Sequence, residues 1–186
     1  MRRGFKTQSE TISLELRSEV GLSAHDRLNC TALASHLAIE VVPITELTAA
    51  GASASDMSCV LDTSTGFSAV TVYRGTRCKI FYNPYEPPTR AANSIAHELS
   101  HVVLEHEPGQ SVSDGIRSWN DSQEEEAAWQ AGALLVPRDG AFVWLHRRGN
   151  VATGAAHFGV SQKLFSWRAN STGVAAQLRR LGDRAA

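Results

Sequence analysis

Long apolar runs are absent from this sequence of 186 residues. A helix that spans a membrane needs about 18 or more consecutive apolar residues, and no stretch approaches that length. The first six residues are basic, but a polar run follows them instead of the apolar core of a signal peptide. We therefore expect a soluble, cytoplasmic protein with no membrane contact.

Cysteine and net charge are also scarce. Cys30, Cys59 and Cys78 are odd in number and show no C-x-x-C spacing, which favours reduced thiols over a disulfide framework or a cysteine zinc site. The net charge of -1 gives no basic field to attract nucleic acid. With 42% hydrophobic and 20% charged residues, the composition is typical of a globular protein.

Hydrophobic periodicity and turn residues predict helices in the first and last parts of the chain and a few short strands between them. A frayed tail is expected up to about residue 8, and a loop at 48–58. Thr89 is expected to cap the central helix, and a hairpin turn is expected at 74–77. The expected helices are 9–20, 26–37, 90–107, 122–136, 139–147, 151–158 and 162–181, the last interrupted near Gly173, and the expected strands are 39–44, 57–61, 68–73 and 79–82.

The central helix carries an H-E-x-x-H motif, from His97 to His101. Residues four apart lie on one helix face, so both imidazoles can bind one metal ion. Glu98 then flanks the position where a water molecule binds. The apolar residues of this helix fall on the opposite face, so the histidines should face a cleft; these residues are Ala92, Ile95, Leu99, Val102 and Val103.

A catalytic zinc ion has three protein ligands and an open position, so one ligand is still missing. The candidates are Glu124, Glu125 and Glu126, at the start of the next helix. Glu125 lies three residues after Ser122, where a capping box would use it, and Glu126 is expected to be solvated. Glu124 is favoured because it shares its helix face with a stripe of small and apolar residues: Ala127, Ala128, Ala131, Leu134 and Leu135.

These residues predict a metal-dependent hydrolase. Zinc would lower the pKa of a bound water and polarise a scissile carbonyl, and Glu98 would act as general base. A second donor to the oxyanion is needed, and the sequence leaves four candidates open: Tyr82, Tyr85, His106 and Arg117. His25 and His36 are expected to be surface residues.

From Asp26 to Pro137 the sequence resembles the ImmA/IrrE family of bacterial metallopeptidases. The matching segments are a helix and a strand, Phe81 to Pro84, Ile95 to His101, Glu124 to Ala127, and Ala131 to Pro137 at matching distance. The resemblance implies zinc ligation by His97, His101 and Glu124, with Glu98 catalytic. Two positions depart from the family: Gln130 replaces an aromatic residue, and Ala128 replaces Asn or Asp, which could weaken the support of a ligand.

The resemblance also implies an α+β fold, in which we expect a small, mostly antiparallel sheet packed with the H-E-x-x-H helix and the second ligand helix. It implies a protein substrate as well. Similar proteins cleave helix-turn-helix repressors and so switch on stress-response genes or mobile-element transfer. We expect a metallopeptidase core at 1–137 and a C-terminal helical extension at 138–186. Residues 155–161 resemble the start of a helix-turn-helix unit, but a helical cap on the core is preferred.

Three hypotheses follow. The first is a zinc endopeptidase that cuts a DNA-binding repressor or an antitoxin-like regulator, which it would hold along the hairpin 68–82. The alternative is a non-catalytic regulatory or protein-binding module on the same fold. Direct DNA binding by the C-terminal helices is the third, and it is not expected because their arginines are sparse.

Overall fold

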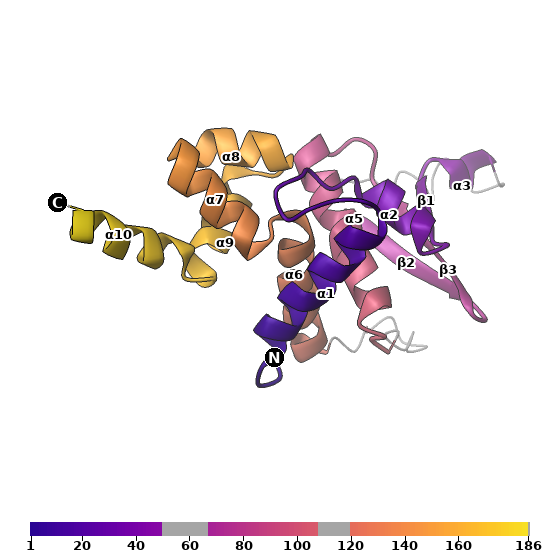
Figure 1. Ribbon diagram of the computed structural model, residues 1–186. Coiled ribbons are helices and arrows are strands. Elements are labelled where there is room, and N and C mark those ends of the chain that lie inside the picture. The colour runs from indigo at the N-terminus through magenta and orange to yellow at the C-terminus, as the bar shows by residue number, and fades with distance from the viewer. Residues whose placement is uncertain (50–66, 108–119, 186) are drawn as a thin grey trace.

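The computed structural model describes residues 1–49, 67–107 and 120–185 (Figure 1). Helices dominate it, and a small sheet lies at one side. None of the helices within these ranges is long and apolar enough to cross a membrane. The helices are α1 (Phe5–Glu19), α2 (Cys30–His36), α3 (Glu46–Ala49), α5 (Pro88–Val103), α6 (Asp121–Leu135), α7 (Arg138–Arg148), α8 (Val151–Phe158), α9 (Gln162–Ser171) and α10 (Val174–Ala185).

The sheet has the strand order β1-β3-β2 in the described part of the chain. Strands β2 (Ala69–Arg74) and β3 (Arg77–Tyr82) form the predicted antiparallel hairpin, while β1 (Glu40–Pro43) pairs parallel to β3. The α+β class is confirmed, with a mixed sheet. The sequence indicated the hairpin through its turn, but nothing local revealed the direction in which the distant strand β1 would pair. The predicted strand 57–61 lies outside the described residues.

Helix α5 lies between the sheet and α6, and α1 packs on α6 (Figure 1). Ile80 of the central strand and Leu99 of α5 are fully buried in one hydrophobic cluster. The same cluster includes Phe158 and Phe165, so the C-terminal helices share the core of the rest of the protein. This continuous core holds α5 and α6 against each other.

The link between α8 and α9 has the predicted turn. Phe158 and Val160 are buried, and Gly159 adopts a left-handed conformation with φ of 69°. A second glycine with positive φ, Gly173 at 78°, separates α9 from α10 at the predicted interruption. Arg168, one of the arginines of the C-terminal helices, is completely buried and so cannot belong to a phosphate-binding face.

The prediction of a frayed tail up to residue 8 is wrong. Helix α1 begins at Phe5, whose side chain is 1% exposed, and Ser9 is buried one turn later. Upstream of the helix, Arg2 bonds to Glu126 of α6. The error arose because Lys6, Thr7 and Gln8 are polar, and a single apolar anchor gives no periodic signal.

Two predicted helix starts also need correction. Thr89 does not cap α5, because the helix already begins at Pro88. Proline suits the first helical position, because an N–H group there would have no hydrogen-bond partner within the helix. Helix α2 begins at Cys30, four residues later than expected, because the side chain of Asn29 accepts hydrogen bonds from two backbone N–H groups of its first turn.

Candidate active site

His97 and His101 lie on one face of α5, half-buried, with their Nε2 atoms 3.1 Å apart. The opposite face anchors the helix through Ile95 and Leu99, as predicted. Ala92, Val102 and Val103 are only partly buried. Ala96 and Ser100 are fully buried instead, because α6 as well as the sheet packs on α5.

Helix α6 delivers the third group. The side chain of Asn120 caps the helix by accepting hydrogen bonds from the backbone N–H groups of Ser122 and Gln123, and Glu124 follows in the first turn. Its Oε2 lies 3.1 Å from His97 Nε2, and its Oε1 lies 3.5 Å from His101 Nε2. The structure therefore brings together the three residues that the sequence analysis selected as metal ligands.

The donor set fits a zinc ion. Two imidazole nitrogens and one carboxylate oxygen are a known ligand set of catalytic zinc sites, with metal–ligand distances of about 2.0–2.2 Å. In a tetrahedral arrangement such ligand atoms are about 3.3 Å apart, close to the 3.1 Å and 3.5 Å separations seen here. The ligand atoms of His97, His101 and Glu124 all lie within 4.8 Å of one another.

Glu98 lies beside this cluster and is held by the sheet. Its Oε2 accepts a hydrogen bond of 2.6 Å from the hydroxyl of Thr71 in β2. Thr71 stands opposite Ile80 in the hairpin register, and Ile80 is fully buried, so both side chains face α5. Thr71 was not among the residues predicted for the site, although the hairpin register together with the buried Ile80 could have placed it on that face.

Burial affects the protonation of the histidines. Desolvation lowers the pKa of His101 below its ordinary value, and the neighbouring His97 lowers it further. The pKa of His106 is lowered in the same way, first by burial and then by His101. Both effects favour neutral imidazoles, and neutral imidazole is the form that binds metal ions.

The prediction that Glu126 is solvated is wrong. Its side chain is 5% exposed instead of solvated, and Oε1 accepts hydrogen bonds from the backbone N–H of Arg2 at 2.9 Å and from Arg2 Nε at 3.1 Å. Burial by itself would raise the pKa of Glu126, but the bonds from Arg2 outweigh it and leave the pKa lowered. Helical periodicity could not reveal this contact, because it comes from a segment 124 residues away.

Glu125 and Ala128 also differ from expectation. Asn120 is the cap of α6, so Glu125 has no capping-box role; it is exposed and pairs with the ammonium of Met1 at 3.2 Å. Ala128 is exposed and does not belong to a buried stripe. Position on one helix face therefore does not by itself distinguish Glu124, because α6 is buried on nearly all sides beyond its second turn.

Gln130 stands where the ImmA/IrrE pattern has an aromatic residue. It is fully buried and donates a hydrogen bond of 2.9 Å from Nε2 to the hydroxyl of Ser13 in α1. Ser13 in turn donates to the carbonyl of Ser9, one turn earlier. A polar bridge between α1 and α6 thus replaces aromatic packing at this position.

The four candidates for the oxyanion donor differ in position and exposure. His106 lies behind His101, with the two Nδ1 atoms 3.0 Å apart, on the side of the ring away from the cluster. Tyr85 is 75% exposed, and Tyr82 packs against the hydrophobic cluster. Arg117 lies outside the described residues. His106 is thereby removed from the oxyanion candidates and becomes a neighbour of the proposed ligand.

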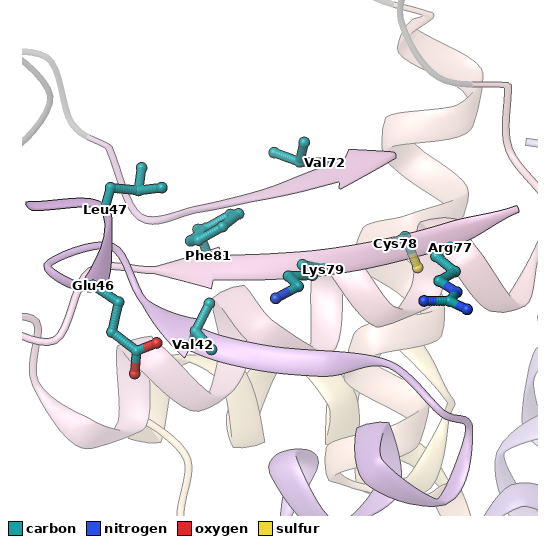
Figure 2. A pocket seen from close by; sticks show the side chains of 8 residues that line it. All are labelled: Val42, Glu46, Leu47, Val72, Arg77, Cys78, Lys79 and Phe81. Atoms are coloured by element: carbon teal, nitrogen blue, oxygen red, sulfur yellow. The ribbon is translucent and has the colours of Figure 1, made fainter. Parts of the chain in front are cut away.

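A separate cavity of about 470 Å³ lies on the sheet and α3 (Figure 2). Lys79 and Phe81 contribute to it from β3, where they alternate with the fully buried Ile80. None of its lining residues is one of the candidate metal ligands His97, His101 and Glu124. The residues that line it are Val42, Glu46, Leu47, Val72, Arg77, Cys78, Lys79 and Phe81.

Comparison with known proteins agrees with this arrangement. Residues 61–170, more than half of the chain, match a peptidase family described as IrrE N-terminal-like domain. No curated protein matches the chain. The matched range contains both the H-E-x-x-H helix and Glu124. The chain therefore belongs to the IrrE N-terminal-like domain family of peptidases.

Proposed function

We propose that the protein is a zinc-dependent endopeptidase. The observation that carries the proposal is the convergence of His97, His101 and Glu124 beside a fourth group, Glu98, which the sheet orients. When bound by the three residues, zinc supplies Lewis acidity toward a carbonyl oxygen and acidifies a water molecule. Membership of a peptidase family agrees with this chemistry.

Glu98 acts as the general base in this proposal. Its carboxylate accepts the proton of the attacking water and returns it to the nitrogen of the leaving amine. The hydrogen bond from Thr71 to Oε2 fixes the orientation of the carboxylate, which avoids a reorientation step during proton transfer. Glu98 follows His97 directly, so the base and a metal ligand move as one unit of α5.

The proposed substrate is a cytoplasmic protein partner, specifically a helix-turn-helix repressor or an antitoxin-like regulator. The support is the resemblance of the sequence to the ImmA/IrrE family, whose similar members cleave such repressors. The substrate would lie along the hairpin 68–82, because β2 carries Thr71 and so passes next to Glu98. An extended peptide aligned with this strand would present its backbone to the cluster.

The alternative is a non-catalytic protein-binding module with a structural metal. The contact between Thr71 and Glu98 favours the enzyme, because a structural site needs no oriented carboxylate beside its ligands. A module of this kind would bind the partner and leave its peptide bonds intact.

Replacing Glu98 with Gln tests the proposal. The protein is incubated with a helix-turn-helix regulator encoded beside its gene, and mass spectrometry identifies any new termini. We expect cleavage at a defined site by the wild type, and at least an about hundredfold slower rate for Glu98→Gln with unchanged zinc content. Glu105→Gln, at an exposed glutamate just after α5, is the matched control and should cleave normally.

Equal cleavage by the wild type and Glu98→Gln would overturn the role of Glu98. Stable binding of the regulator by zinc-loaded wild type without any cleavage would instead support the non-catalytic module.

A further inference from the structure

A buried polar chain runs from His101 away from the metal cluster. Glu105 has a positive φ of 53°, which turns the backbone sharply after the end of α5. The backbone N–H of His106 then donates to the carbonyl of His101 at 3.0 Å. The two imidazoles meet through their Nδ1 atoms, also at 3.0 Å. His106 is therefore fixed to His101 through both main chain and ring.

Glu126 lies on the other side of His106 and is the last residue of this buried polar chain. Its Oε2 lies 3.7 Å from His106 Nε2, beyond hydrogen-bond distance but close enough for the carboxylate to attract an N–H proton at that atom, and the two side chains are only 5% and 6% exposed. Arg2 fixes the carboxylate through its backbone N–H, its Nε and its Nη2. The position of Glu126 is thus determined by bonds that involve neither histidine.

The arrangement of atoms selects the tautomers. His101 Nε2 faces His97 and Glu124, so it must be unprotonated to bind a metal ion. The ring proton of neutral His101 is then on Nδ1, where its acceptor among the described residues is the Nδ1 of His106. His106 accepts with that atom and carries its own proton on Nε2, which points toward the carboxylate of Glu126.

We propose that His106 and Glu126 are positioning residues for His101: together they orient its ring and hold it in the tautomer that exposes Nε2 to the metal. The negative charge of Glu126 stabilises the proton on His106 Nε2, and His106 in turn accepts the proton of His101 Nδ1. Groups that bond to the second nitrogen of a ligand histidine increase its basicity and restrict its rotation. This inference rests on the proposed metal ligation by His101.

Zinc affinity of the full-length protein tests this role separately from catalysis. Affinity is measured by competition with a chromophoric chelator, after circular dichroism has shown that each zinc-free variant is folded. His106→Leu should weaken zinc binding about 10- to 100-fold, the range seen when such supporting residues are lost. His106→Asn retains an acceptor near the former Nδ1 and should recover part of the loss. Glu126→Gln keeps the shape but loses the charge, and should weaken binding about tenfold.

Two matched controls separate positioning from general effects. Glu125→Gln changes the neighbouring carboxylate, which is exposed and paired with Met1, and should leave zinc affinity unchanged. His36→Leu removes an exposed histidine that pairs with Glu19 instead of a candidate ligand, and should do the same. A purely structural role for His106 predicts a lower melting temperature in His106→Leu, with wild-type zinc affinity in the folded protein and no recovery in His106→Asn.

The outcomes distinguish the inference from the proposal on which it rests. If the wild type fails to bind zinc in a 1:1 ratio, or His97→Ala binds it equally well, the proposed metal site is wrong. If the wild type binds zinc through His97 but both His106→Leu and Glu126→Gln bind it as tightly, only the positioning role is overturned. Should His106→Leu fail to fold, Glu126→Gln decides the result by itself.

Discussion

Charged groups of opposite sign lie at the two ends of α6. At the N-terminal end, Glu124 faces the histidine rings of α5. At the C-terminal end, Arg17 donates to the carbonyl of Leu134 at 2.6 Å, and Arg168 donates to the carbonyl of Val136 at 3.0 Å. Both placements agree with the helix dipole, which favours negative charge at the start of a helix and positive charge at its end.

The two ends differ in how their charges are compensated. Arg168 also pairs with Glu10, and Arg17 also donates to the carbonyl of Asp26, so both arginines already have acceptors within the protein. Glu124 instead meets the ring nitrogens of His97 and His101, which can hold a cation together with it. From this difference we expect changes at the C-terminal end to alter stability, and changes at the N-terminal end to alter metal binding.

The largest expected effect is on zinc binding. His97→Ala removes a proposed ligand. Loss of a residue that supports a ligand lowers metal affinity by up to about 100-fold, so zinc affinity should fall further than that here. Peptidase activity should disappear. The unfolding free energy of the zinc-free protein should fall by only about 1 kcal/mol, the size of an ordinary single substitution, because the ring is partly exposed. Chelator competition and urea denaturation measure the two quantities. A large loss of stability in the zinc-free protein would contradict the expectation that changes at the N-terminal end of α6 affect metal binding and not stability.

Arg168→Met should have the opposite effect, lowering stability without changing zinc affinity. The guanidinium is completely buried, and its loss leaves Glu10 and the carbonyl of Val136 without their partner. We expect destabilisation of about 3 to 5 kcal/mol by urea denaturation, with unchanged zinc affinity in the folded protein. Arg179→Met, at an exposed arginine of α10, is the control and should have little effect. Adding Glu10→Gln to Arg168→Met should recover part of the lost stability.

A smaller effect is expected from Gly140→Ala. A Cβ atom at this position of α7 would lie 2.1 Å from the carbonyl oxygen of Ala24, so the loop after α1 or α7 itself must move. Such overpacking costs about 1 to 3 kcal/mol. At Gly182 in α10 an added Cβ meets nothing within 4 Å, so Gly182→Ala should be neutral or slightly stabilising. Thermal denaturation of the two variants would show whether α7 is as tightly fixed as the contact indicates.

The smallest effect concerns Cys30 in α2. Burial raises the pKa of its thiol from 9.0 to about 12, so it should not react with a thiol reagent at pH 8 unless the protein unfolds. Because the pKa is higher in the folded state, the neutral thiol favours folding below pH 9, and this advantage is lost as the pH rises toward 12. The stability difference between the wild type and Cys30→Ala should therefore shrink above pH 9. Peptide mapping of labelled protein and urea denaturation at several pH values measure these effects; rapid labelling of Cys30 in the folded protein would contradict them.

Several elements could be predicted because their signals are local. The spacing of His97 and His101 fixes their common face through the helical period alone. The turn at 74–77 predicted the hairpin, and Gly159 and Gly173 marked the breaks between C-terminal helices. The parallel pairing of β1 could not be predicted in this way, since it depends on contacts between segments far apart in the chain.

Glu126 shows most clearly where sequence reasoning ended. The helical wheel placed it on a solvent-facing side, but Arg2 and His106 approach that side from two other segments. A wheel describes one helix and contains no information about what packs around it. Thr71 was missed for the same reason, because its contact with Glu98 joins a strand to a helix.

The sequence by itself determined the chemical identity of the candidate site: two histidines one turn apart, a carboxylate beside the first, and three carboxylates to choose from in the next helix. The spacing within one helix sufficed, because helical geometry is set by the backbone. Only the tertiary structure decided which carboxylate meets the histidines, which hydroxyl orients Glu98, and which buried chain supports His101. Each of these depends on distances between different elements, and the packing of a shared core sets those distances.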